Sequence, residues 1–347
     1  MENKGIVLVT GGTGFVAMRI ISQLLETGYQ VRTTVRNLKD TGKITAALNA
    51  NHIELRGLSF EVAELTEDAN WAKAMQGCSY VLSVASPVFF HKPKNETEAT
   101  RPAVEGILRV LKFAQQAGVK RVIMTSNFGA VGFTQTDKKR ETTESDWTNV
   151  NAKGLSVYEK SKTLAEMAAW DFIKNKGGNL EFATINPVAI LGPALSPHFS
   201  GSFHLLENLL NGTLKAAPNI PLNVVDVRDV AELHILAMES PKANGQRFIA
   251  SADGQISILE IAELLRKEKP HLTQKVTKRR VPTWVLSIAA LFNAQAKEAL
   301  LLATINRNVS NRKAKQLLRW KPVSTQEETI LASVESMLMF DALPKNS

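Results

Sequence analysis

The feature that most constrains the fold is a glycine-rich turn between an apolar strand and a helix. Residues 6–10 are predicted to form the strand and residues 14–27 the helix. Gly11 permits a sharp turn, and Gly14 removes a side chain where the backbone must approach a ligand. Free N–H groups and the positive dipole end of the helix favour anions. The turn therefore predicts a pyrophosphate site, with the run Thr10-Gly11-Gly12-Thr13-Gly14-Phe15-Val16-Ala17 in GxxGxxA rather than GxGxxG spacing.

The first 190 residues alternate apolar runs with helical patterns. This alternation is typical of a parallel sheet with crossover helices. Strands are expected at residues 6–10, 30–35, 59–63, 80–85, 121–125 and 181–186, and long helices at 96–117 and 156–175. The sequence thus predicts an α/β fold built on a doubly wound parallel (Rossmann) sheet.

After Pro187 the pattern becomes mainly helical. Helices are expected at 202–210, 229–238, 259–267, 283–292, 312–318 and 327–340, and two strands at 223–227 and 246–250. We therefore expect a dinucleotide-binding core at 1–190, to which 223–252 returns. A smaller, mainly helical C-terminal lobe at 191–222 and 253–347 is expected to bind substrate, and the cleft between the two is the expected ligand site.

Composition excludes several classes of function. The 347 residues are 44% hydrophobic and 22% charged, as in ordinary soluble proteins. The net charge of +9 is spread along the chain, with small runs at 138–140 and 278–280, so no nucleic-acid surface is predicted. An anionic ligand would account for part of the excess.

The chain has no predicted membrane span and no predicted metal site. Its most apolar stretch, 284–303, is interrupted by polar and charged residues too often to cross a bilayer. No cluster of His, Cys, Asp and Glu has metal-ligand spacing. The single Cys78 and the lack of a signal pattern before the first strand favour a cytoplasmic location.

The end of the second expected strand indicates which dinucleotide is bound. The run Val31-Arg32-Thr33-Thr34-Val35-Arg36-Asn37 contains no acid that would accept a ribose 2′-hydroxyl. Arg36 can instead bind a 2′-phosphate in a bidentate manner, and Lys43 can reinforce it. The sequence predicts NADP(H) rather than NAD(H).

Tyr158 and Lys162 lie four residues apart, just over one helical turn, so both side chains project from one face of a helix. An ammonium beside a phenol stabilises the phenolate, and we expect it to lower the pKa of Tyr158 from near 10. Such a phenol can pass a proton to a carbonyl oxygen. The pair alone is a weak signal, and its weight depends on the surrounding motifs.

Taken together, the motifs resemble those of the extended short-chain dehydrogenase/reductase family. They are the turn at 10–17, Arg36, Val84-Ala85-Ser86-Pro87, Thr125-Ser126, the Tyr158/Lys162 pair and Asn186-Pro187, followed by the run 226–231 and by Asn311 and Trp320-Lys321-Pro322. They are most similar to the dihydroflavonol reductase, cinnamoyl-CoA reductase and NADPH-dependent aldehyde reductase group. The resemblance spans nearly the whole chain and implies a reductase that transfers hydride from the nicotinamide to a carbonyl.

The resemblance also implies roles for individual residues. Tyr158 would be the general acid, and Lys162 would lower its pKa and hold the nicotinamide ribose. Glu64-Leu65 stands where the family usually has Asp-Leu beside the adenine. The implied cofactor-binding set is Thr10, Gly11, Gly12, Thr13, Gly14, Phe15, Val16, Arg36, Lys43, Glu64, Leu65, Val84, Ala85, Ser86, Thr125, Tyr158, Lys162, Pro187, Val188 and Ile190.

The chain departs from the family at the residue expected to polarise the carbonyl. The family strand usually ends Thr-Ser-Ser, whereas this chain reads Thr125-Ser126-Asn127. Asn127 has an amide N–H₂ that can donate to a developing oxyanion, and Ser126 serves instead if the backbone is locally shifted. Both remain candidates, beside the possibility that neither takes this role.

Aromatic and apolar residues at the expected loop ends predict an apolar or aromatic carbonyl substrate. The candidates are Pro87, Val88, Phe89, Phe128, Phe133 and Phe203. Two other functions remain open: a hydroxysteroid dehydrogenase or sugar-nucleotide epimerase or dehydratase on the same core, and a non-catalytic NADP-sensing regulator. The protein is expected to be a monomer, or a homodimer through helices 96–117 and 156–175.

Overall fold

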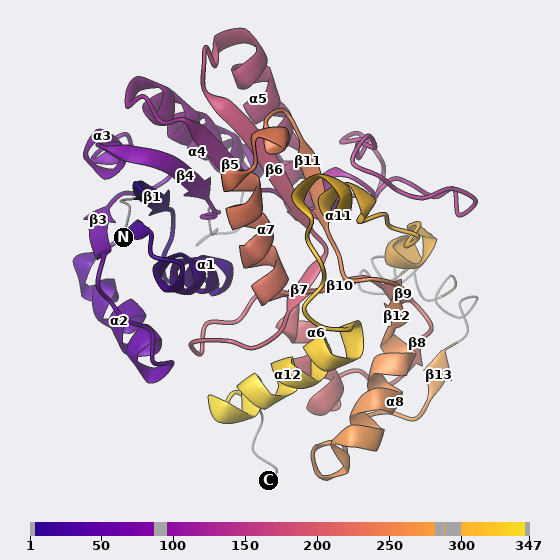
Figure 1. Ribbon diagram of the computed structural model, residues 1–347. Helices are drawn as coiled ribbons and strands as arrows, with labels where there is room; N and C mark the ends of the chain where they lie inside the picture. The colour runs from indigo at the N-terminus through magenta and orange to yellow at the C-terminus, as the bar shows by residue number, and fades with distance from the viewer. Residues whose placement is uncertain (1–3, 87–95, 282–287, 289–299, 344–347) are drawn as a thin grey trace.

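A parallel sheet of seven strands forms the centre of the molecule (Figure 1). The computed structural model describes residues 4–86, 96–281, 288 and 300–343. The strand order is β11-β6-β5-β4-β1-β2-β3, and every neighbouring pair is parallel. The strands are β1 (Ile6–Val9), β2 (Gln30–Val35), β3 (Leu58–Val62), β4 (Cys78–Ser83), β5 (Arg121–Thr125), β6 (Glu181–Pro187) and β11 (Arg247–Ala250). The chain reverses its direction of travel across the sheet between β1 and β4, where such folds bind ligands beyond the carboxyl ends of the strands.

Helices cover both faces of this sheet because each carries one apolar stripe. On one face, α1 (Phe15–Glu26), α2 (Thr41–Ala50), α7 (Val227–Glu239) and α11 (Arg312–Leu318) bury a common cluster with the strands. On the other, α3 (Trp71–Met75), α4 (Glu96–Gln116) and α5 (Val157–Lys176) bury a second cluster. Figure 1 shows α1 and α7 side by side in front of the sheet.

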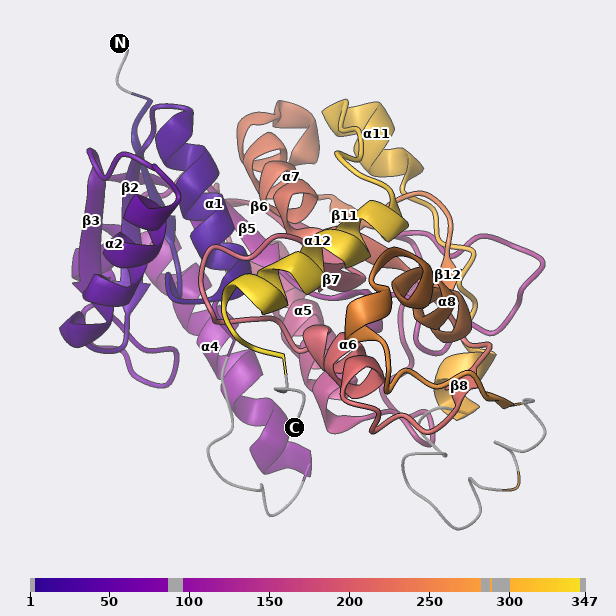
Figure 2. The same cartoon turned by 90° about the horizontal axis from the view of Figure 1, so that it is seen from below.

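A third apolar cluster lies beyond the carboxyl ends of the main strands (Figure 2). It is built by α6 (Phe203–Leu210), α8 (Ile258–Glu268) and α12 (Gln326–Met339). Three short strand pairs accompany it: β7 (Ala189–Leu191) with β10 (Val224–Asp226), β9 (Pro221–Leu222) with β12 (Ile256–Ser257), and β8 (Ala217–Pro218) with β13 (Arg280–Val281). Single-turn helices connect other elements: η1 (Leu38–Asp40), η2 (Phe128–Ala130), η3 (Pro241–Ala243) and η4 (Pro270–Leu272).

The predicted Rossmann sheet is confirmed, with element ends shifted by a few residues. The expected strand 223–227 does not join the main sheet, because β10 pairs with β7. The helix after it begins two residues early, at Val227, because the Asp226 side chain accepts a hydrogen bond from Arg228 N at 2.8 Å and caps it. The expected helix 283–292 falls almost entirely outside the described residues.

No helix among the described residues is long and apolar enough to cross a membrane. That part of the chain also contains no group of three or more His, Cys, Asp or Glu side chains placed to hold a metal ion.

A buried carboxylate ties the C-terminal segment to the core. Asp229 is fully buried in the first turn of α7, and its Oδ1 accepts hydrogen bonds from Trp320 Nε1 at 3.2 Å and Val323 N at 2.9 Å. Its Oδ2 is buried with no hydrogen-bond partner in the described structure. Burial, with the Asp226 carboxylate nearby, raises the pKa of Asp229 to about 7 from its ordinary 3.8.

We predict that Asp229→Asn reduces the loss of stability that occurs as pH rises from about 4 to about 7. The folded carboxyl has the higher pKa, so the native state binds more protons than the unfolded chain between about pH 4 and 7. The contribution of Asp229 to stability therefore falls as pH rises through that window. The asparagine keeps the Oδ1 acceptor and has no charge to bury.

Thermal unfolding of both proteins at about pH 5 and pH 8 measures the effect. The melting temperature of the variant relative to that of wild type should increase with pH. A constant difference between the two pH values would contradict the assignment.

Candidate active site

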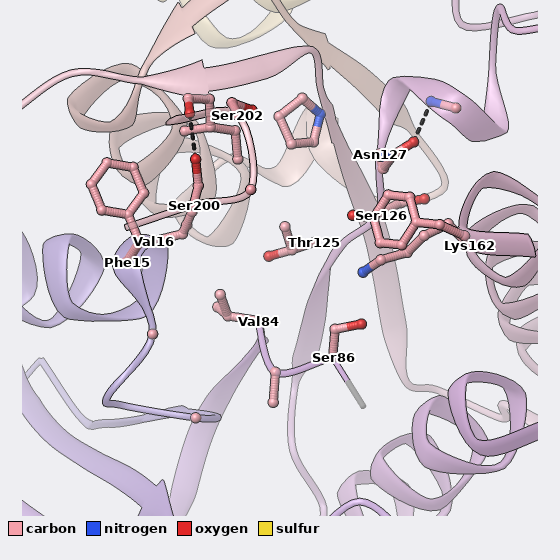
Figure 3. A pocket seen from close by; sticks show the side chains of 18 of the residues that line it. Phe15, Val16, Val84, Ser86, Thr125, Ser126, Asn127, Lys162, Ser200 and Ser202 are labelled. Atoms are coloured by element: carbon pink, nitrogen blue, oxygen red, sulfur yellow. Dashed lines mark hydrogen bonds between the residues drawn. The ribbon is translucent and has the colours of Figure 1, made fainter. Parts of the chain in front are cut away.

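A cavity of about 1100 Å³ runs along the carboxyl ends of the central strands (Figure 3). Its walls come from the turns after β1, β2, β3, β4, β5 and β6, from the start of α5, and from the segments around residues 200, 222 and 301–307. Most residues predicted to bind cofactor lie in these walls: Gly11, Thr13, Gly14, Phe15, Val16, Arg36, Glu64, Leu65, Val84, Ala85, Ser86, Thr125, Tyr158, Lys162, Pro187, Val188 and Ile190.

The glycine turn forms a close backbone surface at one side of this cavity. Gly11 has φ of +72°, and a Cβ built on it would lie 3.0 Å from the Cβ of Ala85. Gly14 is the N-cap of α1 and supplies no side chain to cap the helix. The first N–H groups of α1 are therefore available to an anion, which fits the pyrophosphate of a dinucleotide.

Thr10 and Gly12 support the turn from behind and do not line the cavity in the described structure. Thr10 Oγ1 accepts hydrogen bonds from Val84 N and Ala85 N, both at 2.9 Å, and so fixes the turn after β4 against β1. A Cβ on Gly12 would lie 2.4 Å from Thr33 Oγ1, so this position admits only glycine without rearrangement.

The two basic residues predicted to select a 2′-phosphate have different positions. Arg36 lies in the cavity wall directly after β2. Lys43 is exposed on α2, outside the wall, and its Nζ pairs with Asp40 Oδ1 at 2.7 Å. Of the two, Arg36 is the residue that lines the cavity.

Thr125 lies in the middle of the wall at the end of β5 (Figure 3). Its hydroxyl meets His234 Nε2 at 2.7 Å, and His234 Nδ1 meets Val230 O at 2.7 Å. Burial lowers the pKa of His234 to about 4, so the imidazole is neutral. Nδ1 therefore donates to the carbonyl, and Nε2 accepts the hydroxyl proton of Thr125.

Tyr158 and Lys162 both face the cavity from α5, as their spacing predicts. Lys162 is buried, and Figure 3 shows its amino group reaching toward Thr125 and Ser86. Burial lowers the pKa of Lys162 to about 8, an effect that the carboxylate of Glu166 opposes. The ammonium is therefore still the main form at neutral pH.

The pKa of Tyr158 is raised, so the prediction that it is lowered is wrong. The residue is 51% exposed to the cavity, yet the surrounding walls displace enough water to disfavour the phenolate. A hydrogen bond from the Asn127 side chain lowers the pKa, and the Glu159 carboxylate raises it. Loss of water outweighs the hydrogen bond.

Asn127 and Ser126 face different partners. The Asn127 Oδ1 accepts from Gly129 N (Figure 3), which leaves the amide N–H₂ to meet the Tyr158 phenol. Ser126 is 2% exposed, and its hydroxyl donates to Glu166 Oε2 at 2.5 Å. Of the two candidates, Asn127 is the one beside the phenol.

The carboxylate of Glu166 links α5 to the neighbouring strands beneath this site. It is fully buried on α5, one turn after Lys162, and its carboxylate pairs with Arg247 Nε of β11 at 2.6 Å. Asn186 of β6 donates to Oε2 at 2.7 Å and also to Asn127 O at 3.3 Å. The remaining donors are Trp170 Nε1 and Thr184 Oγ1, both at 3.2 Å. Glu166 thus fixes the backbone that carries Ser126 and Asn127.

The far side of the cavity is mainly apolar. Phe128 and Phe133 line it as predicted, in edge-to-face contact at 6.2 Å between ring centroids. Phe203 is 3% exposed and outside the wall, because it packs on Phe15 and Phe199. The predicted substrate residues Pro87, Val88 and Phe89 lie outside the described residues.

Several lining residues carry no motif that would have pointed to them. Leu222, Asn223, Leu301, Leu302 and Arg307 reach the cavity from distant parts of the chain. Contacts of residues 306–310 with residues 135–142 and with Asn223 bring Arg307 to the cavity.

We predict that Glu166→Gln lowers the free energy of unfolding by about 3–5 kcal/mol, because it leaves the buried Arg247 guanidinium without its counter-charge. Asp171→Asn is the matched control: it makes the same chemical change at an exposed position of the same helix, and it should change stability by less than about 0.5 kcal/mol. Denaturant unfolding measures both. Equal small effects would show that the ion pair does not stabilise the fold.

Comparison with known proteins agrees with this architecture. The model of the 3-beta hydroxysteroid dehydrogenase/isomerase family matches residues 8–255. Cinnamoyl-CoA reductase CAD2 of Medicago truncatula is 35% identical over 273 residues, which cover 77% of this chain and 82% of that protein.

Two solved structures share the fold over almost their whole length. Yeast methylglyoxal/isovaleraldehyde reductase Gre2, complexed with NADPH, superposes with a TM-score of 0.78 at 25% identity, covering 97% of this chain and 99% of that one. Vestitone reductase from alfalfa (Medicago sativa) gives a TM-score of 0.75 at 28% identity, with the same coverage of 97% and 99%. The sheet, the glycine turn and these matches together place the chain in the 3-beta hydroxysteroid dehydrogenase/isomerase family, a branch of the extended short-chain dehydrogenases/reductases.

Proposed function

We propose that the protein is an NADPH-dependent reductase that converts an aldehyde or ketone into an alcohol, with Tyr158 as proton donor. The observation that carries the proposal is the contact between the Asn127 amide and the Tyr158 phenol in a cavity that also contains the glycine turn. The names of the related cinnamoyl-CoA reductase and the NADPH-bound Gre2 support the same class of reaction.

The residues of the cavity fit NADPH, whose reduced nicotinamide supplies the hydride when it is bound. The start of α1 would hold the pyrophosphate, and Arg36 would hold the 2′-phosphate. Pro187, Val188 and Ile190 would lie against the nicotinamide, and Lys162 would hold its ribose. In this arrangement the residues at 1–190 and 223–252 form the cofactor-binding core. The residues at 191–222 and 253–347 form the lobe that binds substrate.

Asn127 and Tyr158 are suited to act on one carbonyl oxygen. The Asn127 amide has two N–H donors, so it can contact the phenol with one and the substrate oxygen with the other. These donors stabilise the negative charge that develops on the oxygen. The raised pKa keeps Tyr158 protonated at neutral pH, so the proton is present when the oxygen needs it. The Lys162 ammonium lines the same cavity one helical turn along α5, and it is the positive charge that we propose for the phenolate that remains.

The other two functions give different results in the same assays. A regulator would bind NADPH without oxidising it in the presence of any carbonyl. A hydroxysteroid dehydrogenase or an epimerase would act on alcohols or sugar nucleotides and not reduce simple aldehydes. The Asn127–Tyr158 contact favours an enzyme over the regulator, because a protein that only senses the cofactor has no need to hold the phenol.

We predict that Asn127→Ala lowers kcat for carbonyl reduction by about 100-fold, as loss of one oxyanion donor does elsewhere. Tyr158→Phe removes the proton donor and should lower kcat by about 100-fold or more. Ser126→Ala should act mainly on stability, by about 1–3 kcal/mol, since it takes one donor from Glu166.

Single-turnover oxidation of NADPH with each variant separates these effects, with thermal unfolding as the measure of stability. A greater loss of turnover for Ser126→Ala than for Asn127→Ala would transfer the carbonyl-polarising role to Ser126.

We predict that Arg36→Ala weakens NADPH binding by about tenfold and changes NADH binding by less than about twofold, because only NADPH carries the 2′-phosphate. Lys43→Ala is the matched comparison: it removes a nearby positive charge whose ammonium is already paired with Asp40, so its effect should be smaller. Titration calorimetry with both dinucleotides measures these affinities. Equal weakening of NADPH and NADH by Arg36→Ala would refute the assignment.

A further inference from the structure

The cavity contains a buried arginine for which the reductase chemistry has no use. Three arginines in the described structure are more than nine-tenths buried, namely Arg121, Arg247 and Arg307. Arg121 pairs with Glu181 and Arg247 with Glu166. Arg307 lines the cavity, its Nε is buried without a hydrogen-bond partner, and no ion pair to it is found among the described residues.

The backbone around Arg307 is firmly held. Its carbonyl accepts hydrogen bonds from Asn223 Nδ2 at 3.1 Å and from Val309 N at 3.0 Å. The preceding residue, Asn306, donates from its side chain to Asp137 O at 2.8 Å and Arg140 O at 2.7 Å. The backbone that carries the guanidinium is therefore held in place before any ligand arrives, which limits the conformational entropy that is lost when the side chain binds one.

The surroundings of the guanidinium are poor in compensating groups. It lies 5.6 Å from the ring centroid of Phe133, and this cation–π contact offsets only part of the cost of its burial. Leu222, Leu301 and Leu302 line the same cavity. Burial lowers the pKa of Arg307 to about 10, and no carboxylate in the described part of the chain opposes this effect. A charge in such a place is best satisfied by an anion from the ligand.

The cofactor phosphates are not suitable candidates for this anion. Arg36 and the glycine turn follow β2 and β1, whereas Phe133 follows β5 and Asn223 precedes β10, which pairs with the segment after β6. Arg307 therefore belongs to the side of the cavity beyond Tyr158 and Asn127, where Phe128 and Phe133 form the wall.

We propose that the substrate is an oxo acid, and that Arg307 is the specificity-determining residue that binds its carboxylate while the carbonyl lies at Tyr158 and Asn127. The proposal rests on the reductase function proposed above. A planar guanidinium matches a carboxylate in bidentate geometry. A single positive charge among leucines and phenylalanines also favours a monoanion, because a dianionic phosphate would leave an unpaired negative charge there. In the reaction the carbonyl carbon gains a hydride and its oxygen a proton, giving a hydroxy acid, and the carboxylate is unchanged.

Matched pairs of substrates test the proposal. NADPH oxidation is measured with oxo acids of increasing chain length, each beside its methyl ester, and with one oxoalkyl phosphate. For the best acid, wild type should have kcat/KM at least about tenfold above that for the ester. Arg307→Leu should lower kcat/KM for the acid by about 10–100-fold and change that for the ester by less than about threefold. Arg307→Lys, which keeps the charge, should retain part of the preference.

Other outcomes would overturn the proposal. If the wild-type kcat/KM is no higher for any oxo acid than for its methyl ester, Arg307 does not have this role. The same holds if Arg307→Leu keeps the wild-type preference for the acid. If the oxoalkyl phosphate is reduced faster than every oxo acid, the anion that Arg307 binds is not a carboxylate. If Arg307→Leu does not fold, calorimetry of wild type with NADP⁺ decides instead, because the hydroxy acid should bind at least about tenfold more tightly than its methyl ester. Absence of NADPH oxidation with acids and esters alike would refute the reductase itself, whereas reduction of esters without preference for acids would refute only the role of Arg307.

Discussion

The arrangement of the site depends on one carboxylate that water does not reach. Glu166 extends from α5 to the ends of three strands. It accepts hydrogen bonds from Ser126 directly after β5, from Asn186 of β6 and from Arg247 of β11. A carboxylate in such a place is stable only if nearly all its lone pairs are used, and here it has a full set of donors, one of them charged. The packing of α5 against the sheet is therefore specified by polar contacts as well as by its apolar face. Any shift of the helix along the sheet would break several of these contacts at once.

The contacts of Glu166 also position Lys162 and Asn127, which line the cavity. Lys162 lies one turn before Glu166, and the carboxylate opposes the loss of its charge on burial. Asn186 binds both Glu166 and the carbonyl of Asn127, so the amide beside the phenol is held by the same network. Arg247 also holds the backbone that follows Asn127, because its Nη2 donates to Ala130 O at 3.4 Å. The Cζ atom of its guanidinium lies 3.7 Å from the ring centroid of Trp147. Ser126 joins the same network through its hydrogen bond to Glu166.

Local patterns in the sequence were sufficient to predict the features that depend on local geometry. The glycine turn needs backbone freedom at Gly11, and the shared face of Tyr158 and Lys162 follows from helical spacing. The different partners of Ser126 and Asn127 were not accessible in this way, since Ser126 donates to Glu166, forty residues away in the chain. The pKa of Tyr158 was predicted in the wrong direction because the spacing reveals the neighbouring ammonium but not the water that the walls displace. No local sequence pattern predicts that Arg307 is buried in the cavity wall. Its burial results from contacts of residues 306–309 with segments more than eighty positions away in the chain.

The buried basic side chains Arg121, Arg247, Lys162 and Arg307 fall into two groups, according to whether the chain itself supplies a paired carboxylate. Arg121 and Arg247 have carboxylate partners within the chain and hold the frame whether or not a ligand is present. Lys162 and Arg307 face the cavity, and burial lowers the pKa of both.

A base whose pKa is lower in the folded state binds its proton less readily than in the unfolded chain, so its burial reduces stability at pH values below that pKa. A ligand that brings hydroxyls or an anion to these groups favours their charged forms and removes part of that cost. Binding of cofactor and substrate is therefore coupled to the stability of the fold, in proportion to their affinity for the native state. The same charges that make the cavity selective for polar ligands thus make the molecule more stable when it is filled.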